Sequence, residues 1–161
     1  MKARNIGIVC TIPDGGLTLL LDLVAADATM RLVTLTTEAE GIGIATGCWL
    51  GGSRAMTAMQ SSGIGNSLNA LALPAAFRAP CLLLVTMRGQ WGEFNPWQIP
   101  MGKATQQALE IMGVTVFRLE QPEDAAEIAS AAASLAFDSD QQIAVLISQR
   151  MIGRKKWTET R

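Results

Sequence analysis

The stretch CLLLVTM, residues 81–87, is apolar at six of its seven positions. A strand with one solvated face alternates between polar and apolar residues, whereas a strand buried on both faces is apolar throughout. NIGIVCTI (5–12) and QIAVLIS (142–148) have a similarly apolar centre. Because strands of this kind need cover on both sides, the pattern predicts a parallel sheet that lies between two layers of helices.

Strand-like segments alternate with segments of helical periodicity along the chain. This alternation predicts one doubly wound α/β domain over residues 1–161, with a mostly parallel six-stranded sheet and helices on both faces. A long loop is expected over 88–100, and a charged tail from about 150 to 161. Beyond the strands named above, we expect strands at 31–36, 54–59 and 114–119, and helices at 17–26, 38–50, 66–77, 103–112 and 122–137.

The composition argues against several classes of partner. The 161 residues carry a formal net charge of −1, so the chain lacks the basic surplus that nucleic acids or anionic membrane surfaces attract. No apolar run reaches the roughly 20 residues of a membrane span. The first ten residues indicate a strand rather than a secretory signal. We therefore expect a cytoplasmic protein that binds neither nucleic acid nor membrane.

The chain contains no histidine and no tyrosine. This removes the commonest general base and the commonest transition-metal ligand, and it excludes a Ser-His-Asp or Cys-His triad within the chain. The three cysteines, Cys10, Cys48 and Cys81, fit no zinc or disulfide spacing and are expected to be buried thiols. Any catalysis must use carboxylates, arginine, lysine, a cofactor or residues of another chain.

Ligands of doubly wound sheets bind beyond the carboxyl ends of the strands. Glu38 lies at such an end, where it is either a helix N-terminal acid that interacts with the dipole or a functional carboxylate. Glu40 points to another side of the same helix and is expected to be a solvated or capping acid. The segments expected at this edge are IPDGG (12–16), TTE (36–38), QSSGIGN (60–66) and MRGQWGEFNPWQIP (87–100).

Two of these segments leave alternatives open. SGIGNS (62–67) places G-x-G before a helix, which is either a phosphate cradle or a tight turn, and it lacks the third glycine and the acid of a dinucleotide fingerprint. The loop over 88–100 is long enough to be a lid or a subunit contact. Arg88 at its start either binds an anionic group bidentately or forms a surface salt bridge.

Three motifs occur in a recognisable order: TTEAEGIGIATG (36–47), QSSGIGNSLNAL (60–71) and RGQWGEFNPWQIPMG (88–102). Together they resemble the pyrimidine-binding (PYR) domain of thiamine-diphosphate enzymes. Within that family they are most similar to the α subunits of sulfopyruvate decarboxylase, and next to phosphonopyruvate decarboxylases. The resemblance implies a thiamine-diphosphate-dependent decarboxylation of a small 2-oxo acid, in the first case 3-sulfopyruvate to sulfoacetaldehyde and CO₂.

The resemblance also assigns roles to residues. Glu38 matches the glutamate that hydrogen-bonds N1′ of the aminopyrimidine and thereby activates thiazolium C2. Where the family often has a histidine, this chain has Met87, so the resemblance leaves proton transfer to a partner chain or to water. Contacts with the cofactor are implied for Gln60, Ser62, Gly63, Gly65 and Asn66, and contacts with substrate or partner for Asp14, Arg88 and Gln98.

The loop also carries three large aromatic residues, Trp91, Phe94 and Trp97. They are bulkier than the family pattern implies, and they predict a pocket shaped for a different 2-oxo acid.

The G-D-G…N segment that binds Mg²⁺ and diphosphate in these enzymes is absent from the sequence. The resemblance therefore implies a separate β chain with a PP domain, in a hetero-oligomer with two-fold symmetry. Gly41, Gly43 and Gly47 lie in one predicted helix, although glycine there costs about 1 kcal/mol relative to alanine. They predict a thin helix face that a neighbouring helix or subunit approaches. A non-catalytic scaffold of the same fold remains an alternative.

Overall fold

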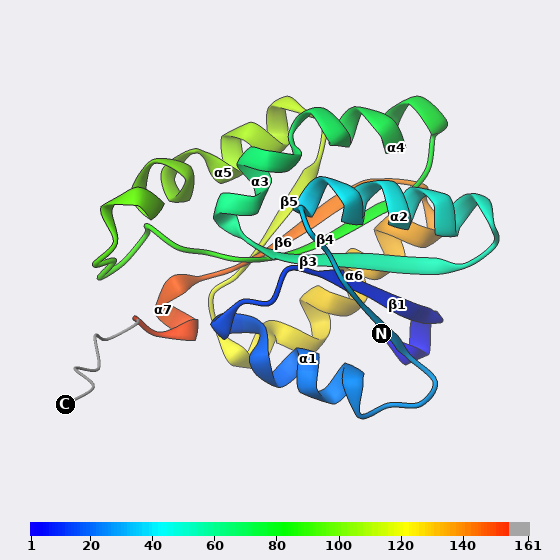
Figure 1. Ribbon diagram of the computed structural model, residues 1–161, viewed down its shortest axis with the longest axis horizontal. Helices are drawn as coiled ribbons and strands as arrows, with labels where there is room; N and C mark the ends of the chain where they lie inside the picture. The colour runs from blue at the N-terminus through cyan, green and yellow to red at the C-terminus, as the bar shows by residue number, and fades with distance from the viewer. Residues whose placement is uncertain (155–161) are drawn as a thin grey trace.

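The computed structural model describes residues 1–154 and contains a six-stranded sheet in which every pairing is parallel (Figure 1). The strand order is β2-β1-β3-β4-β6-β5. Each predicted strand is confirmed, with ends that differ from the prediction by no more than two residues. The strands are β1 (Ile6–Thr11), β2 (Arg31–Thr34), β3 (Arg54–Gln60), β4 (Cys81–Thr86), β5 (Thr115–Leu119) and β6 (Gln142–Ile147).

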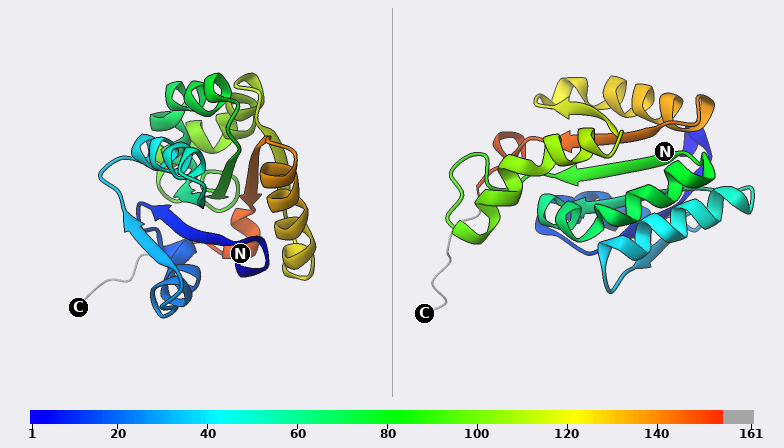
Figure 2. Two further views of the ribbon diagram at one scale, coloured as in Figure 1. Left: turned by 90° about the vertical axis from the view of Figure 1, so that its right-hand side faces the viewer. Right: turned by 90° about the horizontal axis from the view of Figure 1, so that it is seen from above.

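The helices form two layers, one on each face of the sheet (Figures 1 and 2). Crossovers between parallel strands are right-handed, so helices of connections that run in opposite directions along the sheet lie on opposite faces. The connections β1–β2 and β5–β6 run one way, and the other three run back. One layer is α1 (Thr18–Ala25) and α6 (Ala125–Asp138), and the other is α2 (Glu38–Leu50), α3 (Ser61–Ser67), α4 (Ala72–Phe77) and α5 (Ile99–Ile111).

Each face of the sheet has its own apolar core. Val9 and Met56 pack with Phe137 in the layer of α1 and α6. Met59 and Leu83 belong to the core under the other four helices. This double burial explains why the strands are apolar at successive positions rather than at alternate ones.

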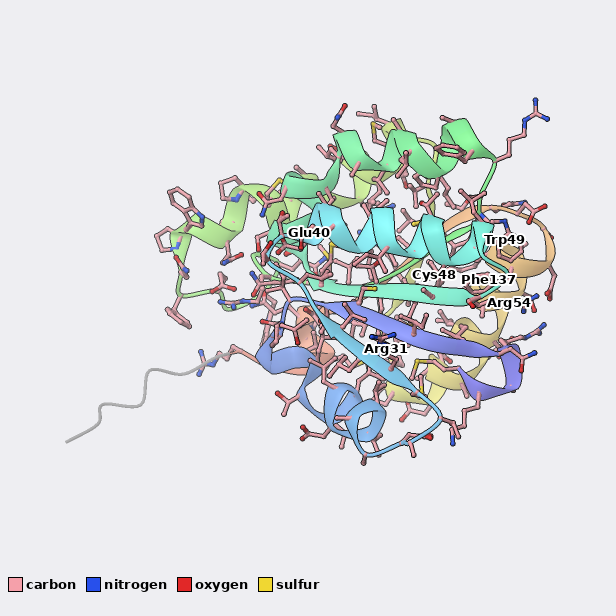
Figure 3. The ribbon with its side chains drawn as sticks, turned by 45° about the vertical axis from the view of Figure 1, so that its right-hand side comes forward. Arg31, Glu40, Cys48, Trp49, Arg54 and Phe137 are labelled. Atoms are coloured by element: carbon pink, nitrogen blue, oxygen red, sulfur yellow. The ribbon has the colours of Figure 1, made fainter. Side chains whose placement is uncertain are left out.

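The amino end of the sheet is closed by a compact cluster (Figure 3). The rings of Trp49 and Phe137 have centroids 6.1 Å apart, and the Arg54 guanidinium carbon lies 5.2 Å from the Phe137 centroid. Cys48 is labelled beside this cluster, whereas Glu40 lies at the opposite end of α2. The polar groups discussed below lie at the other end, the carboxyl edge of the sheet.

The cysteines agree with the prediction in two cases. Cys10 and Cys81 are buried, and burial raises the pKa of their thiols to about 11 and about 12. Cys48 is only half-buried, which the prediction of three buried thiols did not anticipate. Within residues 1–154, the helices are too short or too polar to span a bilayer.

Several element boundaries differ from those predicted. In place of the single helix expected at 66–77, the chain forms α3, η3 and α4 in turn, and α3 begins at Ser61. In QSSGIGN, Gln60 therefore ends β3 and residues 61–66 lie in α3 rather than in a loop. The helix expected at Lys103 begins at Ile99, with Pro100 in its first turn, where its missing N–H has no effect. Of the charged tail, residues 155–161 lie outside the described part. The remaining short helices are α7 (Gln149–Ile152), η1 (Lys2–Arg4), η2 (Gly15–Leu17), η3 (Asn69–Leu71), η4 (Pro96–Gln98) and η5 (Pro122–Asp124).

The three glycines of α2 do not share one role. A Cβ on Gly41 would lie 2.6 Å from Cγ2 of Thr57, so this glycine lets α2 pack closely on its own sheet. Gly43 and Gly47, four residues apart, have no atom within 4 Å of a Cβ built at either position. The thin face predicted from all three glycines therefore consists of Gly43 and Gly47.

Candidate functional site

Glu38 is the first residue of α2 and lies against α3 at the carboxyl edge of the sheet. Although charged, it is only 8% exposed. Asn66 Nδ2 donates a hydrogen bond of 3.0 Å to its Oε2. A Cβ on Gly63 would lie 2.5 Å from its Cγ and 2.7 Å from its Oε1. The carboxylate is thus held between an amide and a bare stretch of helix backbone, and Gly63 is required for this fit.

Glu40 is engaged in a different way. Its carboxylate accepts hydrogen bonds from the Thr36 hydroxyl at 2.6 Å, from Thr36 N at 3.0 Å and from Thr37 N at 3.5 Å. The hydrogen bond from the Thr36 hydroxyl, followed by those from the two backbone groups, lowers the pKa of Glu40. This confirms Glu40 as a capping acid, and it separates the two neighbouring carboxylates by their partners.

Arg88 follows β4 directly and forms an ion pair with Glu93. Its Nε and Nη2 each donate at 2.6 Å, one to Oε2 and one to Oε1. The two side chains are only 10% and 3% exposed. The hydrogen bonds from Arg88 lower the pKa of Glu93 to about 2, against an opposing effect of burial. The bidentate partner of Arg88 is thus a carboxylate of the same loop, and the pair is buried rather than a surface salt bridge, while contact with an anionic substrate stays a prediction.

Gln149 anchors this loop from the far side. Its Oε1 accepts from the backbone N–H groups of Gln90 at 2.9 Å and Trp91 at 3.0 Å, and its Nε2 donates to Glu93 at 2.9 Å. Gln149 is 2% exposed. Sequence reasoning missed both Glu93 and Gln149 as site residues. The available signal for Gln149 was a polar residue directly after an apolar strand at the ligand edge.

The predicted residues Gln60, Ser62, Arg88 and Gln98 do come together. Gln60 Nε2 donates to Ser62 Oγ at 2.7 Å and to Gln98 Oε1 at 3.1 Å. Arg88 Nη1 donates to Gln60 Oε1 at 3.3 Å. The ion pair of the loop is thereby linked to the start of α3. Gly63 and Asn66 of the same helix contact Glu38.

Asp14 joins the same edge from β1. Its Oδ2 accepts from the Thr86 hydroxyl at 3.0 Å and from Gly16 N at 2.9 Å. The charge of Asp14 also contributes to raising the pKa of Arg88, after the larger effect of Glu93. Asp14 therefore ties the loop after β1 to the end of β4.

Glycines explain the shape of the RG…QIPMG motif. Gly89 has a φ of +75°, and a Cβ there would lie 2.4 Å from the carbonyl oxygen of Gln98. A Cβ on Gly102 would lie 1.9 Å from the carbonyl oxygen of Arg88. The loop can close on α5 only without these side chains. Gly65 faces Met101 instead, whose sulfur would lie 3.2 Å from its Cβ, and it therefore lies at the contact between α3 and α5.

Two features of the motif differ from the interpretation above. Met87 is 1% exposed and belongs to the apolar core under α2–α5, so the side chain at this position does not face the polar edge. Trp91, Phe94 and Trp97 are 46%, 40% and 83% exposed. The three aromatic side chains lie at the surface of the loop and do not form a closed pocket within residues 1–154.

The arrangement offers a held carboxylate beside a set of neutral amides and hydroxyls. Over residues 1–154, no group of three or more cysteine, aspartate or glutamate side chains gathers as a metal site. Within the same range the hydrogen bond from Asn66 engages Oε2 of Glu38, which leaves Oε1 for a second partner. Such an oxygen can hold a ligand nitrogen and share a proton with it.

Comparison with known proteins identifies the family. No protein-family model matches the chain. Over 147 residues the chain is 35% identical to sulfopyruvate decarboxylase subunit alpha of Methanocaldococcus jannaschii, in a match that covers 91% of this chain and 87% of the relative. The chain belongs to the family of sulfopyruvate decarboxylase α subunits. This membership agrees with the resemblance carried by the three motifs.

Two further proteins place this α-subunit homologue among wider relatives. The phosphonopyruvate decarboxylase of Streptomyces viridochromogenes is 34% identical over 113 residues, which are 69% of this chain and 28% of that enzyme. The structure of 2-oxoglutarate:ferredoxin oxidoreductase from Magnetococcus marinus, with 2-oxoglutarate, coenzyme A and succinyl-CoA bound, superposes with a TM-score of 0.71 at 16% identity. The superposition covers 98% of this chain and 32% of the oxidoreductase chain. At this identity the likeness shows the fold alone.

Proposed function

We propose that this chain is the pyrimidine-binding subunit of a thiamine-diphosphate-dependent decarboxylase, which converts 3-sulfopyruvate to sulfoacetaldehyde and CO₂ together with a partner chain. Membership of the α-subunit family supports the reaction. The clamped carboxylate of Glu38 is the structural observation that carries the mechanism.

The residues at the edge fit the aminopyrimidine half of that cofactor. A ring nitrogen needs one carboxylate oxygen in a fixed position, and Glu38 offers Oε1 while Asn66 holds Oε2. The exocyclic amine and ring edge need neutral acceptors and donors, which Gln60, Ser62 and Gln98 supply. In contrast, residues 1–154 gather no carboxylate cluster for Mg²⁺ and diphosphate, a task that falls to the partner.

In this mechanism the bound cofactor supplies the electron sink for loss of CO₂. Glu38 would hold N1′ of its aminopyrimidine and would keep a proton in place at that atom. Asp14, which follows β1 and accepts a hydrogen bond of 3.0 Å from the buried Thr86 hydroxyl, would contact the substrate. Met87 takes no part, since its side chain is in the core. An acid or base beyond these groups comes from the partner chain or from water.

The neutralised Arg88 favours a sulfonate over a phosphonate. Glu93 already balances its charge, which leaves Nη1 as a donor toward Gln60. A phosphate-type group carries about −1.5 to −2 charges near pH 7, whereas a sulfonate carries one. A balanced ion pair suits the lower charge, because it does not present a full counter-charge to the substrate. Because one relative is a phosphonopyruvate decarboxylase, phosphonopyruvate is included as a second test substrate.

The partner chain is proposed to cover the Gly43–Gly47 face of α2. Backbone is accessible there, and two apolar neighbours on the same helix, Ile44 and Leu50, are 36% and 61% exposed. On α4, which packs beside α2, Leu73 and Phe77 are 39% and 54% exposed. Together these side chains form an apolar surface suited to a protein partner, arranged as repeated pairs about two-fold axes.

Turnover by the reconstituted pair tests the proposal. CO₂ release is measured with 3-sulfopyruvate, phosphonopyruvate and pyruvate, for the wild type, Glu38→Gln and Glu40→Gln. Both variants remove one charge from the same helix turn, but only Glu38 faces α3. We expect sulfopyruvate to be preferred, Glu38→Gln to lose at least about 100-fold in turnover and Glu40→Gln to keep it.

Full turnover by Glu38→Gln would refute the assigned role. A non-catalytic scaffold predicts a different result: no turnover with any 2-oxo acid and no calorimetric signal when thiamine diphosphate and Mg²⁺ are titrated into the pair. A preference for phosphonopyruvate would overturn the substrate while leaving the role of Glu38 intact.

A further inference from the structure

We infer that Asn66 is a positioning residue, which acts on the reaction through Glu38 and does not touch the cofactor. Its amide fixes the orientation of the Glu38 carboxylate toward N1′. The inference rests on the proposed function, and it revises the cofactor contact that the family resemblance implies for Asn66.

The geometry gives Asn66 one task. Its Nδ2 donates to Oε2 of Glu38 at 3.0 Å, and this is the single side-chain hydrogen bond to Glu38 within residues 1–154. The other amides and the guanidinium at the edge are engaged elsewhere. Gln60 is bonded to Ser62 and Gln98, and Arg88 to Glu93. Asn66 is therefore the polar side chain that restrains the catalytic carboxylate.

The restraint matters because a glutamate carboxyl group rotates freely about its last torsion. This sp³–sp² torsion has a broad, roughly two-fold profile, so the torsion itself does not fix the plane of the carboxylate. Gly63 supports the carboxylate from one side but has no group that bonds to it. The hydrogen bond from Asn66 restrains this torsion and holds the carboxylate plane, with Oε2 on Asn66 and Oε1 beside Gly63.

The helix that carries Asn66 is itself fixed. The next residue, Ser67, is buried, and its hydroxyl donates a hydrogen bond of 2.7 Å to the carbonyl of Gly63. The backbone of α3 is thus tied at the turn that faces Glu38. A change of the Asn66 side chain, which lies at the exposed side of α3, removes the donor without altering the helix.

Three variants of the reconstituted pair test the inference: Asn66→Ala, Asn66→Asp and the control Asn69→Ala. Asn69 is an exposed asparagine three residues further on, without a hydrogen bond to Glu38. For each variant, turnover is measured at saturating thiamine diphosphate and Mg²⁺, and cofactor affinity is measured by calorimetry.

We expect Asn66→Ala to lower turnover about tenfold, the size of one lost hydrogen bond to a charged group, with cofactor affinity within about twofold of the wild type. Asn66→Asp keeps the shape but faces Glu38 with an acceptor. We therefore expect it to lose more turnover than Asn66→Ala. A role in packing alone predicts the reverse order, because aspartate fills the same space. Asn69→Ala is expected to match the wild type.

Several outcomes would overturn the inference. Equal turnover for Asn66→Ala and Asn69→Ala removes the positioning role. A fall in cofactor affinity that equals the fall in turnover indicates direct contact with the cofactor instead. Glu38→Gln, measured in parallel, separates this inference from the proposed function. If Glu38→Gln is inactive while the Asn66 variants behave as the wild type, only the inference fails, and if Glu38→Gln is active, the proposed function fails.

Discussion

Arg88 and Glu93 form a bidentate ion pair at the carboxyl end of β4, with both N–O distances at 2.6 Å. Glu93 also accepts from the backbone N–H groups of Gly89 at 3.3 Å and Asn95 at 3.0 Å. One carboxylate therefore ties both arms of the loop together. These bonds fix the first half of the segment and argue against a lid, whereas contact with another subunit stays a prediction.

The ion pair predicts a loss of stability in acid. Partners in the folded chain lower the pKa of Glu93 from 4.5 to about 2, so its contribution is present above pH 4.5 and is lost as the pH falls toward 2. The shift corresponds to at most roughly 3 kcal/mol in the free energy of unfolding. Denaturant titrations of wild type and Glu93→Gln at pH 7 and pH 3 measure it.

We expect the difference in free energy of unfolding between wild type and Glu93→Gln to be largest at pH 7 and smaller at pH 3. Glutamine keeps the volume and one acceptor, so packing contributes little to this gap. A gap that does not change with pH would show that the charge of Glu93 is not what stabilises the loop.

Gln149→Leu tests the anchor of the loop. The change removes the acceptor of two backbone N–H groups, which lose this partner, and one donor to Glu93, which keeps its bonds to Arg88. We expect a loss of about 1–3 kcal/mol in the free energy of unfolding, together with faster proteolysis between 88 and 98. Gln107→Leu, at an exposed position of α5, is the matched control and is expected to change neither. Equal proteolysis of both variants would contradict the anchoring role.

Strands and ligand edge could be predicted from the sequence because they depend on local patterns. Leu83 and Ile143 are wholly buried, as continuous apolar runs require. The start of α3 could not be predicted, since Gly63 argues against a helix when its contact with Glu38 is unknown. Tertiary packing overrides propensity at this position.

The hydrogen-bond partners of Arg88 and Gln149 could not be predicted from the sequence either. Gln149 meets Gln90 across 59 positions of chain, and no local pattern encodes this contact. The pairing of Arg88 with Glu93 depends on a loop that closes only because Gly89 has a positive φ. The motifs predicted which residues meet at this edge, such as Gln60 and Gln98, but the distribution of charge among them required the fold.

Gly63→Ala tests the clamp on Glu38. A Cβ at this position would overlap the Glu38 side chain at 2.5 Å, so the carboxylate must leave its clamped position. We expect turnover of the reconstituted pair to fall at least about tenfold, while circular dichroism reports an intact fold. Gly7→Ala, where a Cβ meets no atom within 4 Å, is the control. Unchanged turnover in Gly63→Ala would mean that the clamped position is not the active one.

The open glycines make opposite predictions for the isolated chain and for the assembly. In the isolated chain, Gly43→Ala and Gly47→Ala add a side chain in empty space, and we expect each to raise the free energy of unfolding by about 0.5–1 kcal/mol. If the partner covers this face, larger side chains separate the two chains. Gly43→Leu is therefore expected to weaken association at least about tenfold in sedimentation experiments.

The control for association is Asp22→Leu, which adds a leucine at an exposed position of α1 on the other face of the sheet. It is expected to leave assembly unchanged, because the proposed interface lies on α2 and α4. Normal assembly of Gly43→Leu, or loss of assembly in Asp22→Leu, would move the interface to another face. The two glycines weaken α2 as an isolated helix, and this comparison measures whether the weakness is offset by contact with a second chain.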